Sequence, residues 1–435
     1  MYSLILIISG LLCSSIGNAQ DYSNPQRSFT FSTAYAEKIF NSNEGLVDFP
    51  ISALESYGAL FDVATSSINK SWGARLLIAT LELPLSYWFT FSLAIPFHEF
   101  GHARAAYAFG QNYSYRTQAF GKTVSAIPNY WLLGLARLIT PPFFFPGTGS
   151  AWTSHQGAPR VNSKLSEYWG IGSTTIITSA AGLNNQSLFA KKIAHGIYSQ
   201  RGHISQTLHY FMNKVSGFVY SLLDRRHNAL LSVGSSDISA VIKGYQNKGY
   251  SITHGDIELQ SLLSLISGTS YALLKGYYDY IAHGDARVSS PELFNVRIPD
   301  INSYINAKGL SLEFVSGYRF SDSLFFDVAY ELIWKGEPVH QLTPMVRFDV
   351  ASLNPSLNSL WLCADIVIAK GVGGSVSADW EPFNDRHTSF WRRFSYFAAL
   401  YFHNGYSLYG ERNISALFKE NTSNFSGFAG LRLNY

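Results

Sequence analysis

The spacing of apolar side chains changes near residue 290 and divides the chain into two regions. Before that point apolar residues recur at a helical spacing, and clusters rich in Gly, Pro and Asn separate the runs. The pattern predicts helices over residues 51–69, 74–109, 127–140, 164–195, 205–232 and 257–283. Residues 113–124 are expected to be extended and to form a hairpin.

After residue 309 the period becomes two. Over residues 324–334 the apolar residues fall on every second position, and similar runs follow to the end of the chain. We count about eight strands of roughly ten residues, the minimum for a transmembrane β-barrel. Trp334, Trp361, Trp380 and Trp391 stand at strand ends, as interfacial aromatic residues do. A soluble antiparallel barrel or sandwich shows the same alternation and is the alternative.

These patterns together predict an α+β multidomain protein. We expect a helical, membrane-associated domain over 20–289, a linker over 290–309 and an antiparallel β-barrel of about eight strands over 310–435. The chain has 435 residues, enough for two or more domains. Charged residues make up only 14 % of it, against about 25 % in ordinary soluble domains. This shortage of charge indicates a lipid membrane or a large buried surface.

The first 19 residues are expected to be an export signal. Leu4 to Leu12 is an apolar core, and Gly17-Asn18-Ala19 is a small-x-small cleavage site. Removal of this segment would leave Cys363 as the only cysteine and exclude an intramolecular disulfide. The net charge of +3 and the lack of a basic cluster argue against a nucleic-acid partner. The sequence does not predict an oligomeric state.

The most informative motif is His98-Glu99-Phe100-Gly101-His102. Two histidines four residues apart lie on one face of a helix, so both imidazoles can bind a single Zn²⁺. Glu99, between them, is placed to act as general base on water at the metal. An uncharged, aromatic-rich run from Pro84 to Phe97 leads directly into the motif. A polar helix end without a metal is the alternative interpretation.

Residues 98–110, His-Glu-Phe-Gly-His-Ala-Arg-Ala-Ala-Tyr-Ala-Phe-Gly, resemble the first core segment of site-2 proteases, the intramembrane zinc metalloproteases. Residues 179–186, Ser-Ala-Ala-Gly-Leu-Asn-Asn-Gln, resemble the second element of that family, with Leu183 in place of Pro. The chain also ends on Gly430-Leu431-Arg432-Leu433-Asn434-Tyr435, which resembles the C-terminal assembly signal of outer-membrane barrels.

The first resemblance implies a zinc protease that cleaves polypeptide substrates. His98 and His102 would bind zinc, Glu99 would be catalytic, and Asn184 or Asn185 would stabilise the oxyanion. The third ligand of the family comes from a Leu-Asp-Gly element, which this chain lacks; Asp279 is the nearest candidate. The other candidates for this ligand are His155, His195, His203, His209, Asp224, His227, Asp256 and Asp285.

Two further functions stay open at this stage. One is a non-catalytic outer-membrane barrel with a helical periplasmic domain, and the other is a zinc hydrolase of non-peptide substrates. The two resemblances also differ in location. Glu82, Pro84 and Pro96 weaken residues 76–97 as a membrane span. We therefore expect an outer-membrane location in a Gram-negative envelope with the helices facing the periplasm, and the inner membrane is the alternative.

Overall fold

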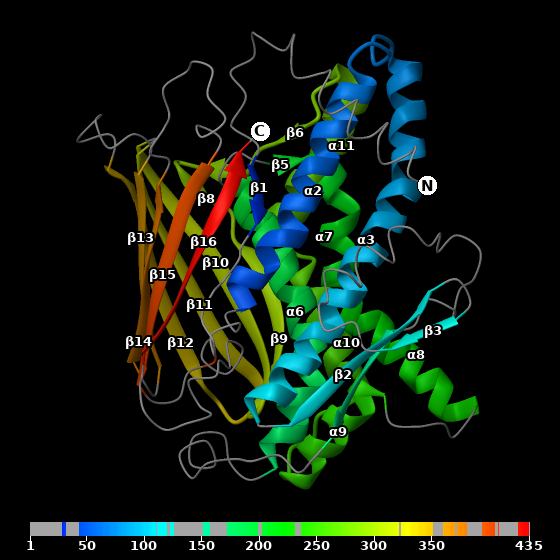
Figure 1. Ribbon diagram of the computed structural model, residues 1–435, viewed down its shortest axis with the longest axis vertical. Coiled ribbons are helices and arrows are strands. Elements are labelled where there is room, and N and C mark those ends of the chain that lie inside the picture. The colour runs from blue at the N-terminus through cyan, green and yellow to red at the C-terminus, as the bar shows by residue number, and fades with distance from the viewer. Residues whose placement is uncertain are drawn as a thin grey trace.

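The protein is an α+β structure in which a layer of helices lies against a large, mostly antiparallel sheet (Figure 1). The computed structural model describes residues 28–31, 43–109, 111–119, 122–125, 151–156, 172–198, 202–230, 236–321, 323–350, 360–369, 372–380, 394–404, 408 and 425–434. The expected signal at 1–19, the expected helix at 127–140 and Tyr435 lie outside these ranges.

The helices follow the apolar periodicity, but several begin or end at caps within the expected runs. The described helices are α2 (Asn43–Thr65), α3 (Trp72–Ala108), α6 (Ser173–Tyr198), α7 (Thr207–Lys214), α8 (Ser216–Leu230), α9 (Asp237–Asn247), α10 (His254–Ser264) and α11 (Gly268–His283). The single helix expected over 257–283 is two helices, because the Ser267 side chain caps a new start by accepting a hydrogen bond from Ser270 N. Helix α9 was not expected.

Helix α3 is the longest of the described helices and carries the His-Glu-x-x-His motif in its last third. Within the part of the chain that the structure describes, Trp72–Ala103 is the one segment long and apolar enough to cross a membrane by length and composition. Buried core helices of soluble proteins pass the same test. Here only 39 % of the most apolar window is buried, so most of this window is not covered by the protein itself.

The large sheet has eleven strands, in the order β1, β16, β15, β14, β13, β12, β11, β10, β8, β7, with β9 also pairing with β10. Their bounds are β1 (Ser28–Phe31), β7 (Glu292–Leu293), β8 (Val296–Arg297), β9 (Asp300–Asn306), β10 (Gly309–Ser321), β11 (Leu324–Gly336), β12 (His340–Asp349), β13 (Leu360–Ile368), β14 (Val372–Trp380), β15 (Phe394–Asn404) and β16 (Phe425–Asn434).

This sheet differs from the closed barrel of about eight strands that the sequence predicted. Seven strands, β10 to β16, come from residues 310–435 and their immediate flank, and no closed ring is found among the described residues. The expected linker at 290–309 contains β7, β8 and β9. Strand β1 extends the sheet at its other end by pairing with β16, Phe29 opposite Leu433.

Two small sheets complete the described structure. The expected hairpin at 113–124 is confirmed as β2 (Asn112–Ala119) and β3 (Lys122–Ser125), and β4 (Ala151–Gln156) pairs with the other side of β2. Strand β5 (Gly202–His203) pairs with β6 (Arg287–Val288) and leads into a short 3₁₀ turn, η3 (Ile204–Gln206). Strand β2 directly follows α3, so it lies close to the end of the motif helix.

Helix α6 is the centre of the helical layer. One face packs on α2 and α3 in an apolar core that includes Phe97, Phe189 and Ile193. Another face packs on α9 and the end of β9, in an apolar core that includes Ile176, Leu183 and Ile305. Because α6 touches both α3 and α9, it fixes the distance between the motif helix and the start of α9.

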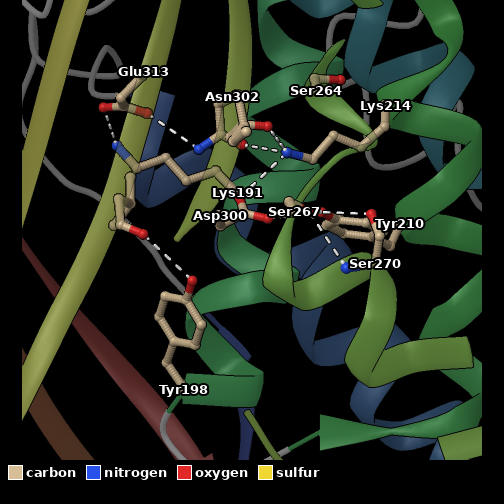
Figure 2. Close-up of polar contacts among 12 residues, drawn as sticks. Lys191, Tyr198, Tyr210, Lys214, Ser264, Ser267, Ser270, Asp300, Asn302 and Glu313 are labelled. Carbon is tan, nitrogen blue, oxygen red and sulfur yellow. Dashed lines mark hydrogen bonds and ion pairs between the residues drawn. The ribbon is translucent and has the colours of Figure 1, made fainter. Parts of the chain in front are cut away.

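Polar side chains join the helical layer to the sheet. Figure 2 shows the Lys214 ammonium reaching Asp300 Oδ2 at 3.2 Å and Asn302 Oδ1 at 2.8 Å on β9. It also donates to the carbonyl oxygen of Ile301, so three acceptors match its three protons. Lys191 on α6 forms an ion pair with Glu313 on β10 at 2.7 Å. The space between helices and sheet is therefore lined by paired polar groups.

Candidate metal centre

Small residues let α3 and α6 approach each other closely at the motif. A Cβ added at Gly101 would lie 2.4 Å from the carbonyl oxygen of Ala181, so only glycine fits this contact. One turn away, the buried amide of Asn185 donates from Nδ2 to the carbonyl oxygen of Phe97 at 2.9 Å. These two contacts place the small-residue stretch of α6 directly against the two histidines.

The imidazoles of His98 and His102 face each other with their Nε2 atoms 3.1 Å apart. Each ring is fixed through its other nitrogen: Nδ1 of His98 lies 3.1 Å from Oε1 of Gln186, and Nδ1 of His102 lies 2.7 Å from the carbonyl oxygen of Thr178. Metal-ligating histidines in proteins keep a proton on Nδ1 and present an unprotonated Nε2. Burial lowers the pKa of His102, but the carboxylates of Asp237 and Glu99 outweigh burial and raise it to about 9, so this imidazole gives up one proton when a metal binds. Both side chains are buried.

Asp237 supplies a third donor. Its Oδ2 atom lies 3.2 Å from Nε2 of His98 and 3.1 Å from Nε2 of His102. One ligand atom from each of the three residues lies within 4.8 Å of the others, so the group could hold a metal ion. We call these three residues the candidate metal centre. The Asp237 side chain is 31 % exposed, so solvent reaches this one of the three donors.

The charge state of Asp237 suits this role. Burial alone would raise the pKa of its carboxyl, but the two imidazoles outweigh this effect and hold the pKa well below its usual range. The carboxylate is therefore ionised at neutral pH. Two imidazoles and one carboxylate form the donor set of many catalytic zinc sites, with a fourth position left for water or substrate.

Gly182 provides the space beside these donors. A Cβ added there would lie 2.5 Å from Nε2 of His98 and 2.6 Å from Nε2 of His102. Any other residue would push on the two nitrogen atoms that face Asp237. The donor chemistry and this side-chain-free space both fit a zinc ion held by His98, His102 and Asp237.

The first turn of α9 is held in place by Asp224 on α8. Asp224 Oδ2 accepts a 2.7 Å hydrogen bond from Ser239 Oγ and lies 2.8 Å from Nε2 of His254. Its Oδ1 accepts a hydrogen bond from Ser236, the residue that caps α9. Burial raises the pKa of the Asp224 carboxyl, but these hydrogen bonds lower it by more. The pKa is therefore below its usual value, and the group is a carboxylate at neutral pH. Asp237 lies between the two bound serines.

Glu99 is buried on α3 next to His102, whose charge it influences. Its position between the two histidines places it on the turn that carries both imidazoles. The sequence-based hypothesis for Glu99 as general base therefore stays a prediction with a compatible location.

The other predicted site residues have contacts of their own. Asp279, the expected third ligand, forms an exposed ion pair with Lys275 one turn away on α11, and Asp237 is found with the histidines in its place. The Asn184 amide bonds to the backbone of Ile305: its Nδ2 donates to the carbonyl oxygen at 2.8 Å, and its Oδ1 accepts from the backbone N–H at 2.9 Å. Asn185 bonds to α3 as described above. Both amides thus join backbones, and the expected oxyanion role stays a prediction.

The alternative third-ligand candidates also have other partners or lie apart. His203 bonds to Asp62, His209 to Thr90, Asp256 caps α10, and Asp285 accepts from the backbone of Arg287. His195 lies near the end of α6, and the side chains of His155 and His227 are outside the described set. Ser236 followed by Asp237 is an ordinary helix-start signal, and it could have identified α9 but not its neighbour α3.

Comparisons with known proteins gave no match: no family model, curated protein or solved structure matches this chain.

Proposed function

We propose that this protein is a zinc-dependent hydrolase that cleaves peptide bonds. The observation that carries the proposal is the convergence of His98 and His102 on α3 with Asp237 on α9, which is 135 residues from His102 in the sequence. A third donor beside the two histidines supports a metal enzyme over a non-catalytic protein with an incidental motif. The likeness of residues 98–110 to site-2 proteases supports a peptide substrate over a non-peptide one.

Each residue has a distinct task in this proposal. When bound, zinc supplies a Lewis acid that polarises the substrate carbonyl and activates water. His98 and His102 hold the ion through Nε2 and are themselves oriented by Gln186 and Thr178. Glu99 takes the proton from the attacking water and delivers it to the departing amine. The exposed side of Asp237 gives substrate and water a route to the centre.

The test is a Glu99→Gln variant assayed beside the wild type. Both proteins are purified in detergent, loaded with one equivalent of Zn²⁺ and incubated with unstructured polypeptides whose fragments are identified by mass spectrometry. General-base catalysis contributes about 10²- to 10⁴-fold. We expect at least a 100-fold slower cleavage in the variant with unchanged zinc content.

Glu292→Gln is the matched control, because Glu292 lies on β7 of the large sheet and pairs with Arg319 on β10. It should cleave at the wild-type rate. Wild-type cleavage by Glu99→Gln would exclude the general-base role. A zinc-loaded wild type that hydrolyses esters or amides but no peptide would favour the non-peptide hydrolase instead.

A further inference from the structure

In the large sheet, apolar side chains are exposed on one face and charged side chains are buried on the other, which is the inverse of a water-soluble sheet. In strands β11 to β15, the even-numbered residues share the more exposed face of the sheet, and the odd-numbered residues share the more buried face. Outward side chains such as Ile366, Val376 and Leu400 are 54 %, 57 % and 68 % exposed. Inward side chains include buried Asp327 and Glu331. A sheet that faces water carries its polar residues on the outside.

The outward positions form one continuous surface, because cross-strand partners share a face. Val346 on β12 lies opposite Ala364 on β13, Ala364 opposite Val376 on β14, and Val376 opposite Leu400 on β15. Among the even-numbered positions of β11 to β15 whose side chains are described, none is Asp, Glu, Lys or Arg. We call this surface the outer sheet face.

The charged and polar side chains that the outer sheet face lacks lie on the inward side of the sheet, where they bond to one another. Arg297 and Asp327 form a buried ion pair at 2.7 Å, and Asp365 accepts from Ser375 on the neighbouring strand. Lys191 reaches Glu313 from α6 (Figure 2). Charged and polar groups are therefore gathered on the inward side of the sheet, and the outer sheet face is left with apolar side chains, which water does not favour.

From this inversion we infer that the outer sheet face contacts the acyl chains of a phospholipid bilayer. Strands β12, β13, β14 and β15 have 10, 9, 9 and 11 residues, and a tilted strand needs about 9–11 residues to cross the hydrocarbon core. Trp380 and Tyr396, paired at the ends of β14 and β15, have the aromatic character of membrane interfaces.

Helix α3 shows the same inversion and distinguishes a bilayer from a protein partner. Its buried side carries Glu82, Ser86 and Thr90, whereas Leu77 and Leu81 are 59 % and 56 % exposed. Figure 1 shows the first half of α3 on the opposite flank of the molecule from β13 to β15. A second copy or another protein would cover one flank, but a bilayer surrounds both. The inference does not depend on the proposed hydrolase activity.

Spin labels read out by electron paramagnetic resonance test the inference on the full chain. Cys13 and Cys363 are replaced by alanine, and one cysteine is introduced as Val376→Cys or Ser377→Cys. The labelled protein is reconstituted in vesicles of phosphatidylcholine and phosphatidylglycerol (3:1). Collision rates are measured with oxygen, which concentrates in lipid, and with a water-soluble nickel chelate. Position 377 is the matched control, because it is next along β14 and lies on the opposite, less exposed face of the sheet.

We expect the label at position 376 to collide more often with oxygen than with the nickel chelate, and the label at 377 to show no such excess. A label at 376 that collides freely with the nickel chelate would mean that the outer sheet face meets water. A label at 376 shielded from both reagents would mean that protein covers it. Either result would overturn the inference, and zinc content of the same samples reports separately on the metal centre.

As a second measurement, the unlabelled wild type is mixed with the same vesicles, washed with alkaline carbonate and floated on a density gradient. The inference requires that the protein floats with the vesicles. Recovery of the folded protein in the soluble fraction would contradict it without reliance on any substituted variant.

Discussion

Replacement of Gly182 by alanine should destroy metal binding and leave the fold intact. The new Cβ would lie 2.5 Å from Nε2 of His98, whereas ordinary contact begins at 3.4 Å. The imidazole must therefore move by about 0.9 Å, and His102 by a similar amount, while zinc–ligand distances tolerate only about 0.2 Å. Because the contacts are with the ends of side chains, the rings can rotate away without displacing the backbone.

The magnitude follows from the number of ligands disturbed. Loss of a single residue that orients a ligand weakens metal affinity about 10- to 100-fold. Displacement of two ligands at once should exceed 100-fold, or about 2.7 kcal/mol. The helix itself should gain up to about 1 kcal/mol, the difference in helix propensity between alanine and glycine. The free energy of unfolding of metal-free Gly182→Ala should therefore equal or exceed that of the metal-free wild type.

Gly196→Ala is the matched control, because it lies in the same helix and its Cβ would meet nothing within 4 Å. Zinc affinity is measured by competition with a fluorescent chelator, and stability by urea unfolding of the metal-free proteins. Wild-type zinc affinity in Gly182→Ala would refute the assignment of the metal to this side of the two histidines.

Two further predictions concern residues that hold the site and the interior. Asp224→Asn should lower zinc affinity about 10- to 100-fold, because it loosens the turn that carries Asp237, and Asp256→Asn, in the capping box of α10, should not. Equal affinities in the two variants would remove the positioning role. Lys214→Met should destabilise the protein by about 3–5 kcal/mol in urea unfolding, because it leaves Asp300 buried without its cation. Lys275→Met, which breaks an exposed pair, should leave the unfolding midpoint unchanged. A similar loss in both lysine variants would contradict the account of the interior.

Local patterns in the sequence were sufficient to predict the elements that depend on periodicity. The alternation from Leu324 to Trp334 correctly predicted β11 and the residues that share its face, because side chains alternate along any strand. The run over 74–109 correctly predicted α3. The same patterns carry no information on which strands lie at the sheet edges. Strand β1, from residues 28–31, and β9 were therefore missed, and the sheet was expected to close on itself.

The candidate site was predictable only where its residues are close in sequence. His98, Glu99 and His102 share two turns of one helix, so their spacing alone brings them together. Asp237 is 135 residues from His102, and its approach depends on the packing of α9 against α6. Asp279 matched the expected residue type on a plausible helix, but nothing in its local sequence shows that the helix faces elsewhere.

The most direct test of the central claim is the zinc content of the purified full chain. Wild type, His98→Ala, His102→Ala, Asp237→Asn and Asp279→Asn are each dialysed against trace zinc and analysed by mass spectrometry of the metal. We predict one zinc per chain in the wild type and in Asp279→Asn, and none in the other three. A folded wild type without zinc, or full zinc content in Asp237→Asn, would contradict a metal centre formed by His98, His102 and Asp237.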